Sequence, residues 1–239
     1  MREALFFPDD WQIENRKLLA ALRRYADLNG IEIRENMQIE RLCVEDGIVT
    51  GAETDNEKLA ADVTILATGA WTSLIKLGVA EMPFKIEPIR GQVIAFQTAK
   101  RLFQRVIYSP RGYIVPRADG RILAGSTTER AGFDKELTET AAGSLREMAS
   151  EIAPSTYGLT TSDHWSGLRP AAADKMPVVG RLNSVGGLVI ATAHYRNGIL
   201  LAPWTAETVA RSVFNHTVSA LPDAFSPDRF RLRRVSTSS

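Results

Sequence analysis

An apolar run, a polar turn and an apolar helical pattern follow one another at residues 187–213, and this order constrains the fold more than any other feature. Gly187 to Ala193 is short, nearly continuous in apolar residues and rich in β-branched ones, which predicts a strand covered on both faces. Asn197 and Gly198 are residue types that begin helices, and apolar side chains recur at helical spacing after them, which predicts a buried helix. A covered strand that turns into a helix is typical of an α/β protein.

The start of this expected helix can also bind a ligand. The first amides of a helix have no partner within it, and the helix dipole is positive at that end. A negative or electron-accepting group is therefore favoured there. From this stretch alone, an ordinary strand-to-helix connection and a ligand cradle both stay open.

The first 80 residues carry one helical pattern and several short β-rich segments. Apolar side chains at helical spacing predict an amphipathic helix over Glu14 to Leu28, ended by Asn29 and Gly30. The expected strands are Ile31 to Arg34, Ile39 to Val44, Ile48 to Thr54 and Asp62 to Ala67. The last strand is predicted to be buried and to stop at Thr68 to Trp71, before another helix. Ligands often bind where such a strand ends.

Short β-rich segments alternate with glycine and proline between Phe84 and Ser126, which predicts an antiparallel sheet. Its expected strands are Val93 to Phe96, Val106 to Ser109, Tyr113 to Pro116 and Ile122 to Ser126. Glu136 to Ile152 predicts a charged amphipathic helix packed on that sheet, and an α/β pattern returns from Asp163. The chain is therefore expected to leave one domain, build a second and return to the first.

Charge and cysteine content exclude several classes of function. Lysine plus arginine (29) nearly balances aspartate plus glutamate (28), and the net charge of +1 gives no electrostatic case for nucleic acid or an anionic membrane. The single cysteine, Cys43, rules out an intrachain disulfide and indicates a reducing compartment, with the cytoplasm as the expected location. No apolar run has the length of a membrane span. The terminal arginines, predicted to form a solvated tail, are Arg229, Arg231, Arg233 and Arg234.

Sequence signals for metal, hydrolase and phosphate-loop chemistry are missing. The three histidines, His164, His194 and His216, lack paired metal-ligand spacing and cysteine partners, so no metal site is expected. The chain has no Gly-x-Ser-x-Gly elbow and no Walker lysine. The commonest hydrolase and phosphate-loop functions are therefore not expected.

Four phrases occur in an order and spacing that resemble the FAD-dependent D-amino acid oxidase family. They are Ala67 to Trp71 (Ala-Thr-Gly-Ala-Trp), Gly112 to Arg117 (Gly-Tyr-Ile-Val-Pro-Arg), Gly167 to Pro170 (Gly-Leu-Arg-Pro) and His194 to Pro203. The last three are most similar to the phrases of the glycine oxidase branch, which serves thiamine biosynthesis. The resemblance covers essentially Met1 to Arg231.

The resemblance implies a mixed α/β (α+β) fold, with a partial FAD-binding Rossmann-like domain interleaved with an antiparallel-sheet substrate domain. The FAD-binding domain is expected at residues 13–78 and 162–235, the substrate domain at 1–12 and 79–161, and a tail at 236–239. The implied reaction is the oxidation of a small primary amino acid, glycine above all, with non-covalent FAD and oxygen. It yields hydrogen peroxide and an imine that hydrolyses or feeds thiazole formation. The flavin carries this chemistry and the protein supplies orientation and electrostatics; a homo-oligomer stays open.

Three side chains are implied to bind the substrate. Arg169 matches the residue that holds the substrate carboxylate, since a planar guanidinium can donate two parallel hydrogen bonds to it. The alternative is a structural pairing with an internal acid such as Asp174. Tyr113 matches a phenol near the substrate, or is a core tyrosine. Arg196 matches an arginine close to the flavin ring and the substrate, or faces solvent at the turn.

The turn into the expected helix is implied to bind FAD, because the helix amides and dipole would stabilise the negative charge of the reduced flavin ring. Trp71 is placed near the flavin, or packs as an ordinary aromatic side chain. The backbone of Ile39 matches a position that contacts adenine. The implied cofactor-binding residues are Ile39, His194, Tyr195, Arg196, Asn197, Gly198, Ile199 and Leu200, and no catalytic residue is assigned.

Two positions depart from the glycine oxidase pattern. Arg111 replaces a histidine and Thr128 replaces a methionine, and both bear on pocket shape, so the identity of the amine stays open. The sarcosine oxidase branch attaches its flavin through a cysteine in the C-terminal half. Cys43 is the only cysteine of this chain, so a covalent flavin of that kind is not expected.

The dinucleotide fingerprint Gly-x-Gly-x-x-Gly, which binds the FAD pyrophosphate at a helix start, is missing, because no two glycines are two or three positions apart. The chain is therefore expected to be an N-terminally truncated form that binds FAD poorly by itself. Two other functions stay open. One is a cofactor-free, inactive binding module, and the other is a dehydrogenase of the same family for a D-amino acid or an N-methyl amine.

Overall fold

The computed structural model describes residues 4–214 and 222–230 of the chain. The chain divides into two compact units and passes between them several times. Unit 1 consists of Met1–Glu35, Val93–Ser126 and Glu139–His164, and unit 2 of Asn36–Gln92, Thr127–Thr138 and Trp165–Ser239. These boundaries differ from those of the expected domains, since residues 13–35 fall in unit 1 and residues 79–92 in unit 2. The assignment of a cofactor domain and a substrate domain stays a prediction.

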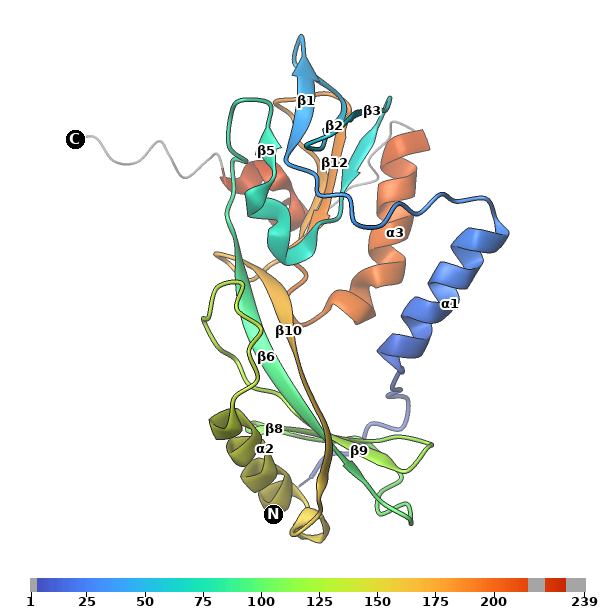
Figure 1. The fold of residues 1–239 in the computed structure, drawn as a ribbon, viewed down its shortest axis with the longest axis vertical. Helices are drawn as coiled ribbons and strands as arrows, with labels where there is room; N and C mark the ends of the chain where they lie inside the picture. The colour runs from blue at the N-terminus through green and yellow to red at the C-terminus, as the bar shows by residue number, and fades with distance from the viewer. Residues whose placement is uncertain (1–3, 215–221, 231–239) are drawn as a thin grey trace, which may run out of the picture. The chain divides into compact units, whose positions relative to one another are not determined.

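An antiparallel sheet and a covering helix make up most of unit 1 (Figure 1). The five strands of the sheet, in spatial order, are β10 (Thr161–Ala172), β6 (Ile86–Gln97), β9 (Arg121–Gly125), β8 (Gly112–Pro116) and β7 (Ile107–Ser109). α2 (Glu139–Ile152) covers this sheet, because its Leu145 and Met148 lie in one buried cluster with Ile94 of β6. The expected antiparallel sheet and its helix are confirmed, although the helix begins at Glu139 rather than Glu136.

α1 (Asn15–Leu28) also belongs to unit 1, and the expected amphipathic helix is confirmed. The preceding residue, Glu14, forms an ion pair with Arg121 of β9 at 3.0 Å. Ala26 is the buried residue of this helix, whereas Leu22 is 55% exposed. Much of the apolar face of α1 is therefore uncovered in the described structure.

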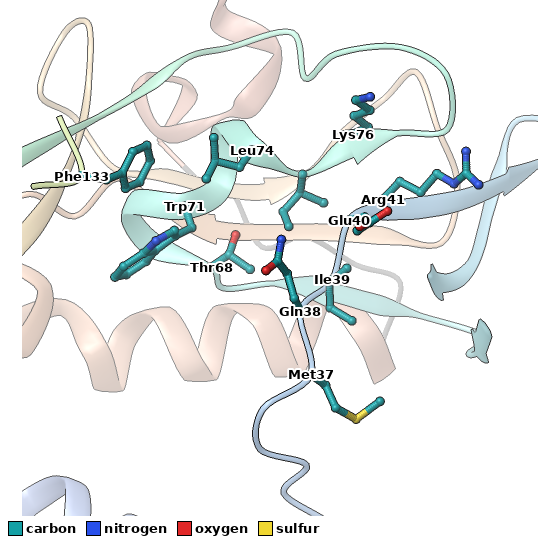
Figure 2. A pocket seen from close by; sticks show the side chains of 11 residues that line it. Met37, Gln38, Ile39, Glu40, Arg41, Thr68, Trp71, Leu74, Lys76 and Phe133 are labelled. Carbon is teal, nitrogen blue, oxygen red and sulfur yellow. The ribbon is translucent and has the colours of Figure 1, made fainter. Parts of the chain in front are cut away.

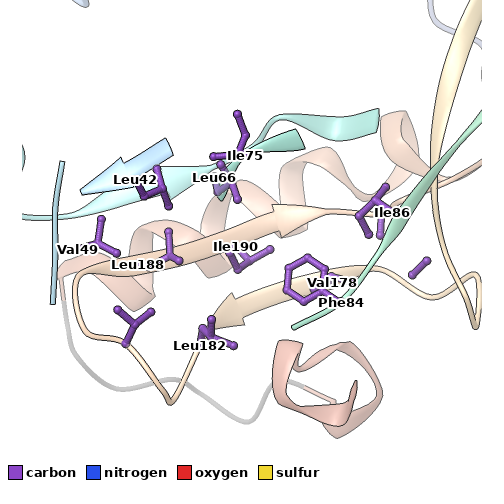
Figure 3. Close-up of a cluster of buried hydrophobic side chains, with 13 residues drawn as sticks. Leu42, Val49, Leu66, Ile75, Phe84, Ile86, Val178, Leu182, Leu188 and Ile190 are labelled. Atoms are coloured by element: carbon purple, nitrogen blue, oxygen red, sulfur yellow. The ribbon is translucent and has the colours of Figure 1, made fainter. Parts of the chain in front are cut away.

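Unit 2 contains two small sheets. The first, in spatial order, consists of β3 (Lys58–Ala60), β2 (Ile48–Glu53), β1 (Arg41–Glu45) and β5 (Lys76–Leu77), and the second of β11 (Val178–Arg181), β12 (Leu188–Thr192) and β4 (Thr64–Leu66). Side chains of both sheets, such as Leu42, Leu66 and Ile190, meet in one buried cluster (Figure 3). The covered strand expected at Gly187 to Ala193 is confirmed as β12, where Val189 and Ile190 are fully buried.

Three expected elements, one in unit 1 and two in unit 2, differ in the structure. Residues Ile31 to Arg34 form no strand, and Ile31 is 55% exposed. β propensity alone does not form a strand where no neighbouring strand is available for pairing. β4 spans only three residues, and its Ile65 is 48% exposed, so the expectation of a fully buried strand is wrong. The helix expected after Thr68 is the short 3-10 helix η1 (Gly69–Leu74).

The remaining helical segments are α3 (Gly198–Phe214) and three 3-10 helices, η2 (Pro154–Thr156), η3 (Asp223–Phe225) and η4 (Pro227–Phe230). Arg229 of η4 pairs with Asp174 at 2.8 Å and its side chain is 13% exposed, so its expected place in a solvated tail is wrong. Arg231, Arg233, Arg234 and the tail at 236–239 lie outside the described residues. Within the described part of the chain, no helix is long and apolar enough to cross a membrane.

Candidate functional site

The carboxyl ends of two parallel strands meet at one edge of the second sheet of unit 2. β4 and β12 run parallel, with Leu66 opposite Ile190. Just beyond them, the Thr192 hydroxyl donates to the Gly69 carbonyl at 3.1 Å and lies 3.0 Å from the Thr72 hydroxyl. The segments that leave the two strands are therefore held together. Ligands of α/β proteins commonly bind just beyond the carboxyl ends of neighbouring parallel strands.

The turn between β12 and α3 has a constrained backbone. Ala193 and Tyr195 have positive φ angles of 61° and 50°, which residues other than glycine adopt only when the surrounding structure imposes them. The Tyr195 amide donates to the Pro170 carbonyl at 3.0 Å. This bond ties the turn to β10, directly beside Arg169.

α3 begins at the expected position. Its first intrahelical bond runs from the Leu201 amide to the Asn197 carbonyl at 2.9 Å, so the amides of Gly198, Ile199 and Leu200 precede that bond and have no partner within the helix. Ile199 and Leu200 are 50% and 78% exposed. The expectation of a buried helix is therefore wrong, because α3 covers the sheet with one narrow face. The residues buried on that face are Thr205, Val209 and Ser212.

His194 lies within this turn and links it to α3. Its Nε2 atom is 2.8 Å from the Thr205 hydroxyl. Burial lowers the pKa of the His194 imidazole below its ordinary value of 6.5. The ring is therefore neutral at pH 7, and its contact with a cofactor stays a prediction.

Arg169 lies on β10 with its guanidinium over β6. Nη1 donates to the Thr127 carbonyl at 3.1 Å, and a Cβ atom built on Gly91 would stand 2.2 Å from Nη1 and Nη2. Asp174, the alternative partner, instead pairs with Arg229. The hydrogen bond from Arg229 holds the pKa of Asp174 below its ordinary range.

Arg196 contacts the same segment as Arg169, the residues that follow β9. Its Nη2 donates to the Thr128 hydroxyl at 3.1 Å, while the neighbouring Thr127 carbonyl accepts from Arg169. The structure therefore brings these two sequence-predicted arginines to adjacent residues of one segment. Two guanidinium groups in one place favour a carboxylate ligand, to which they donate charge-assisted hydrogen bonds.

A buried polar network lies behind this segment, and the sequence alone did not reveal it. The Arg90 side chain is 9% exposed and pairs with Glu129 at 2.7 Å and with Asp134 at 2.8 Å. The fully buried Gln92 amide donates to Glu129 at 3.0 Å. Burial acts to raise the pKa of Glu129, but hydrogen bonds from Thr127, Arg90 and Gln92 outweigh it and keep this pKa below 4.5. Glu129 is therefore a carboxylate at neutral pH.

A pocket of about 940 Å³ opens in unit 2 where β4 gives way to η1. Its lining residues are Met37, Gln38, Ile39, Glu40, Arg41, Thr68, Trp71, Leu74, Ile75, Lys76 and Phe133. Figure 2 shows Trp71 and Phe133 at one end and Arg41 and Lys76 toward the other. The two aromatic ring centroids are 6.1 Å apart. Ile39, which the family resemblance implied, lines this pocket, and Phe133, which no sequence motif pointed to, also lines it.

The pocket and the start of α3 fit the groups that FAD presents. The volume lies within the range of about 300–1,000 Å³ usual for cofactor sites. Apolar and aromatic side chains suit a planar ring, and Lys76 suits a phosphate, whereas Arg41 is paired with Glu53 at 2.5 Å. The residues present are therefore compatible with FAD, and the contacts of the predicted cofactor-binding residues stay predictions.

Tyr113 belongs to unit 1, where it lies on β8 opposite Gly125 of β9. A Cβ atom on Gly125 would stand 2.6 Å from the Tyr113 hydroxyl, so the half-buried ring lies directly over this glycine. The position explains why glycine is needed there. The role of Tyr113 as a substrate-binding phenol stays a prediction.

The described residues offer arginines, hydroxyls and backbone groups for binding. Cys43 is a free, half-buried thiol. Within residues 4–214 and 222–230, no group of three or more His, Cys, Asp or Glu side chains is placed to hold a metal ion.

Comparisons with known proteins show the family of the chain. The family described as "FAD dependent oxidoreductase" matches residues 1–212. A bifunctional protein ThiO/ThiG of Synechocystis sp. is 35% identical over 228 residues, which are 93% of this chain and 34% of that protein. A glycine oxidase of Pseudomonas putida is 37% identical over 204 residues, which are 84% of this chain and 55% of that protein.

The fold is also that of solved family members. The crystal structure of glycine oxidase from Geobacillus kaustophilus has a TM-score of 0.80 and 28% identity, covering 89% of this chain and 57% of that one. The chain thus spans about half the length of the curated glycine oxidases it matches. From the extent of the family match and from these relatives, the chain belongs to the FAD-dependent oxidoreductase family of the D-amino acid oxidase type.

Proposed function

We propose that this chain carries the substrate-carboxylate site of an FAD-dependent oxidase that converts glycine to its imine with release of hydrogen peroxide. The observation that carries the proposal is the convergence of Arg169 and Arg196 on the Thr127–Thr128 segment. Family membership supports FAD as the cofactor, and the two glycine oxidase relatives support glycine as the substrate.

Arg169 binds and orients the substrate. Its guanidinium is held in place by the Thr127 carbonyl, and a planar, prepositioned guanidinium fixes the direction of a carboxylate as well as its affinity. Arg196 adds a second positive charge beside the same segment, and the role of Tyr113 as a substrate-binding phenol stays a prediction. With the carboxylate fixed, the carbon next to the amine has one orientation for reaction.

The cofactor is FAD, held without a covalent bond. The amides of Gly198, Ile199 and Leu200 favour the negative side of the ring, and the remaining predicted residues, His194, Tyr195 and Asn197, shape the turn before them. Ile39 and Trp71 line the pocket that suits an aromatic ring. Bound FAD would supply the acceptor for a hydride from the substrate carbon and would pass the electrons on to oxygen.

A role in thiazole formation follows from the same chemistry. The imine of glycine is reactive and is either hydrolysed or consumed by a following condensation. The similarity to the bifunctional protein ThiO/ThiG supports this use of the product. A cytoplasmic location and a homo-oligomer stay predictions.

Peroxide formation tests the oxidase function. The purified protein is mixed with glycine and increasing FAD, and peroxide is measured with a peroxidase-coupled dye. We expect peroxide that requires both glycine and FAD and that rises with FAD concentration, because the missing Gly-x-Gly-x-x-Gly fingerprint predicts weak FAD binding by this chain. Protein that binds FAD without releasing peroxide, but reduces an artificial electron acceptor, is a dehydrogenase. Protein that shows neither FAD binding nor peroxide is a cofactor-free binding module, and either result contradicts the proposal.

A further inference from the structure

The guanidinium of Arg169 occupies space that only glycine leaves free. A Cβ atom at Gly91 would stand 2.2 Å from both terminal nitrogens of Arg169 and 2.4 Å from its Cζ atom. Gly91 has no left-handed backbone that would itself require glycine. The glycine is therefore needed for close approach, and the guanidinium lies flat on strand β6.

The segment that follows β9 holds both arginines through adjacent residues. The Thr127 carbonyl accepts from Arg169 at 3.1 Å, and the Thr128 hydroxyl accepts from Arg196 at 3.1 Å. Any shift of this segment moves both acceptors together. The position of Thr127 and Thr128 therefore sets the position of both guanidinium groups.

Glu129 fixes this segment to β6. Its backbone pairs with Arg90 through two hydrogen bonds of 2.9 Å, and its carboxylate accepts from the Arg90 guanidinium, the Gln92 amide and the Thr127 hydroxyl. The Thr127 hydroxyl in turn accepts a hydrogen bond of 2.8 Å from the backbone N–H of Gln92. One carboxylate thus joins the segment to two buried side chains of β6.

We propose that Glu129 is a positioning residue for substrate binding, which acts by fixing the Thr127–Thr128 segment that orients Arg169 and Arg196. The inference rests on the proposed role of these two arginines. A site held within about half an ångström by its supporting contacts binds more tightly than one that must be ordered by the ligand. The network therefore affects ligand affinity as well as stability.

The test uses the full chain with five variants, of which Arg169→Leu tests the proposed function itself. Glu129→Gln keeps the size of the side chain but removes its charge and one of its acceptor oxygens. Thr128→Val removes the hydroxyl that holds Arg196, and Thr128→Ser retains it. Glu87→Gln is the matched control, because Glu87 lies on β6, like the Arg90 and Gln92 partners of Glu129, and pairs with the exposed Arg130 at 2.9 Å.

Two measurements are made on each protein. Arginine side-chain NMR reports the Nε signals and the rate of rotation about the Nε–Cζ bond of Arg169 and Arg196. Titration with glycine, and with acetate as a bare carboxylate, gives a dissociation constant. In Glu129→Gln we expect faster rotation of both arginines and at least tenfold weaker binding, with a cooperative thermal transition retained.

Thr128→Val should release Arg196 alone, and Thr128→Ser should restore its signal. Glu87→Gln should bind within twofold of the wild type. A folded Glu129→Gln protein with unchanged arginine signals or with unchanged affinity would overturn the inference. If Glu129→Gln does not fold, Thr128→Val provides the test. An unchanged Arg196 signal in Thr128→Val would overturn the proposal that the Thr127–Thr128 segment orients this arginine.

A wrong role for Arg169 and a wrong role for Glu129 give different binding results. Wild-type protein that does not bind glycine, or an Arg169→Leu variant that binds it equally well, contradicts the proposed function. In that case the arginine signals alone decide whether Glu129 positions the two side chains. Weak binding by Arg169→Leu with normal binding by Glu129→Gln contradicts only the positioning role.

Discussion

Arg169 is the residue on which substrate binding depends most. Replacement by leucine removes the charge-assisted hydrogen bonds to the carboxylate, each worth about 1.5–3 kcal/mol, and we expect the KM for glycine to rise by about a hundredfold or more. Arg169→Lys keeps the charge but loses the planar, bidentate geometry, so its KM should lie between the two. Steady-state kinetics of the FAD-supplied protein checks this order, and equal KM values for the three proteins would remove Arg169 from the site.

His194 predicts how stability depends on pH. Burial lowers the pKa of the folded imidazole below the ordinary 6.5, so the unfolded chain takes up a proton first as the pH falls. The stability that neutral His194 contributes is present above pH of about 6.5 and is lost as the pH falls through the folded pKa. His194→Gln lacks this titration.

Thermal melts at pH 7.5 and pH 5 measure the effect of His194. The melting temperature of the wild type should fall relative to that of His194→Gln at the lower pH. Two-dimensional NMR of the imidazole gives the pKa directly. A His194 pKa at or above 6.5 in the folded protein would contradict the effect of burial.

The sequence predicts some residues of the site better than others. Arg169 and Arg196 lie in phrases that resemble known family motifs, and the helix start at Gly198 has its own local signal. Glu129 was not predicted, because its contacts with Arg90 and Gln92 join residues 37–39 positions apart. The polar residues Arg90 and Gln92 within the largely apolar β6 are the one sequence signal that could have indicated a buried network.

Strand β12 depends on a glycine at its start. Gly187 has a φ of 72°, and a Cβ atom there would stand 2.5 Å from the Val49 carbonyl oxygen. We expect Gly187→Ala to destabilise the protein by about 1–3 kcal/mol, since it adds backbone strain and a steric clash. Urea unfolding measures this change.

A second glycine provides the control for Gly187. Gly143 lies inside helix α2, and nothing stands within 4 Å of a Cβ atom built on it. Gly143→Ala should therefore stabilise the protein by about 0.5–1 kcal/mol, because alanine favours helix more than glycine does. A loss of stability in Gly143→Ala, or none in Gly187→Ala, would disagree with the described backbone.

Element lengths show where sequence patterns fail. β6 and β10 each span 12 residues, although only Val93 to Phe96 was expected as a strand in the first of them. Pro88 and Gly91 interrupt the pattern of β6, and such residues usually mark strand ends. Gly91 is tolerated because the Arg169 guanidinium fills the space beside it, a long-range contact that no local pattern contains.

At the scale of the whole molecule, the interleaved path of the chain was predictable from the change between α/β and antiparallel patterns. The boundaries of the two units were not, because they depend on which unit α1 and the 79–92 segment pack with. The exposed apolar face of α1 illustrates the limit. An amphipathic pattern predicts a helix but does not say what covers it.

Anaerobic reduction of added FAD by glycine tests the central claim most directly, because it needs no oxygen or other acceptor. The protein is saturated with FAD, and the absorbance of the oxidised flavin near 450 nm is followed after glycine is added. We predict bleaching by the wild type and much slower bleaching by Arg169→Leu at the same glycine concentration. Flavin that stays oxidised in the wild type, or bleaches equally in both proteins, would contradict a glycine site built on Arg169.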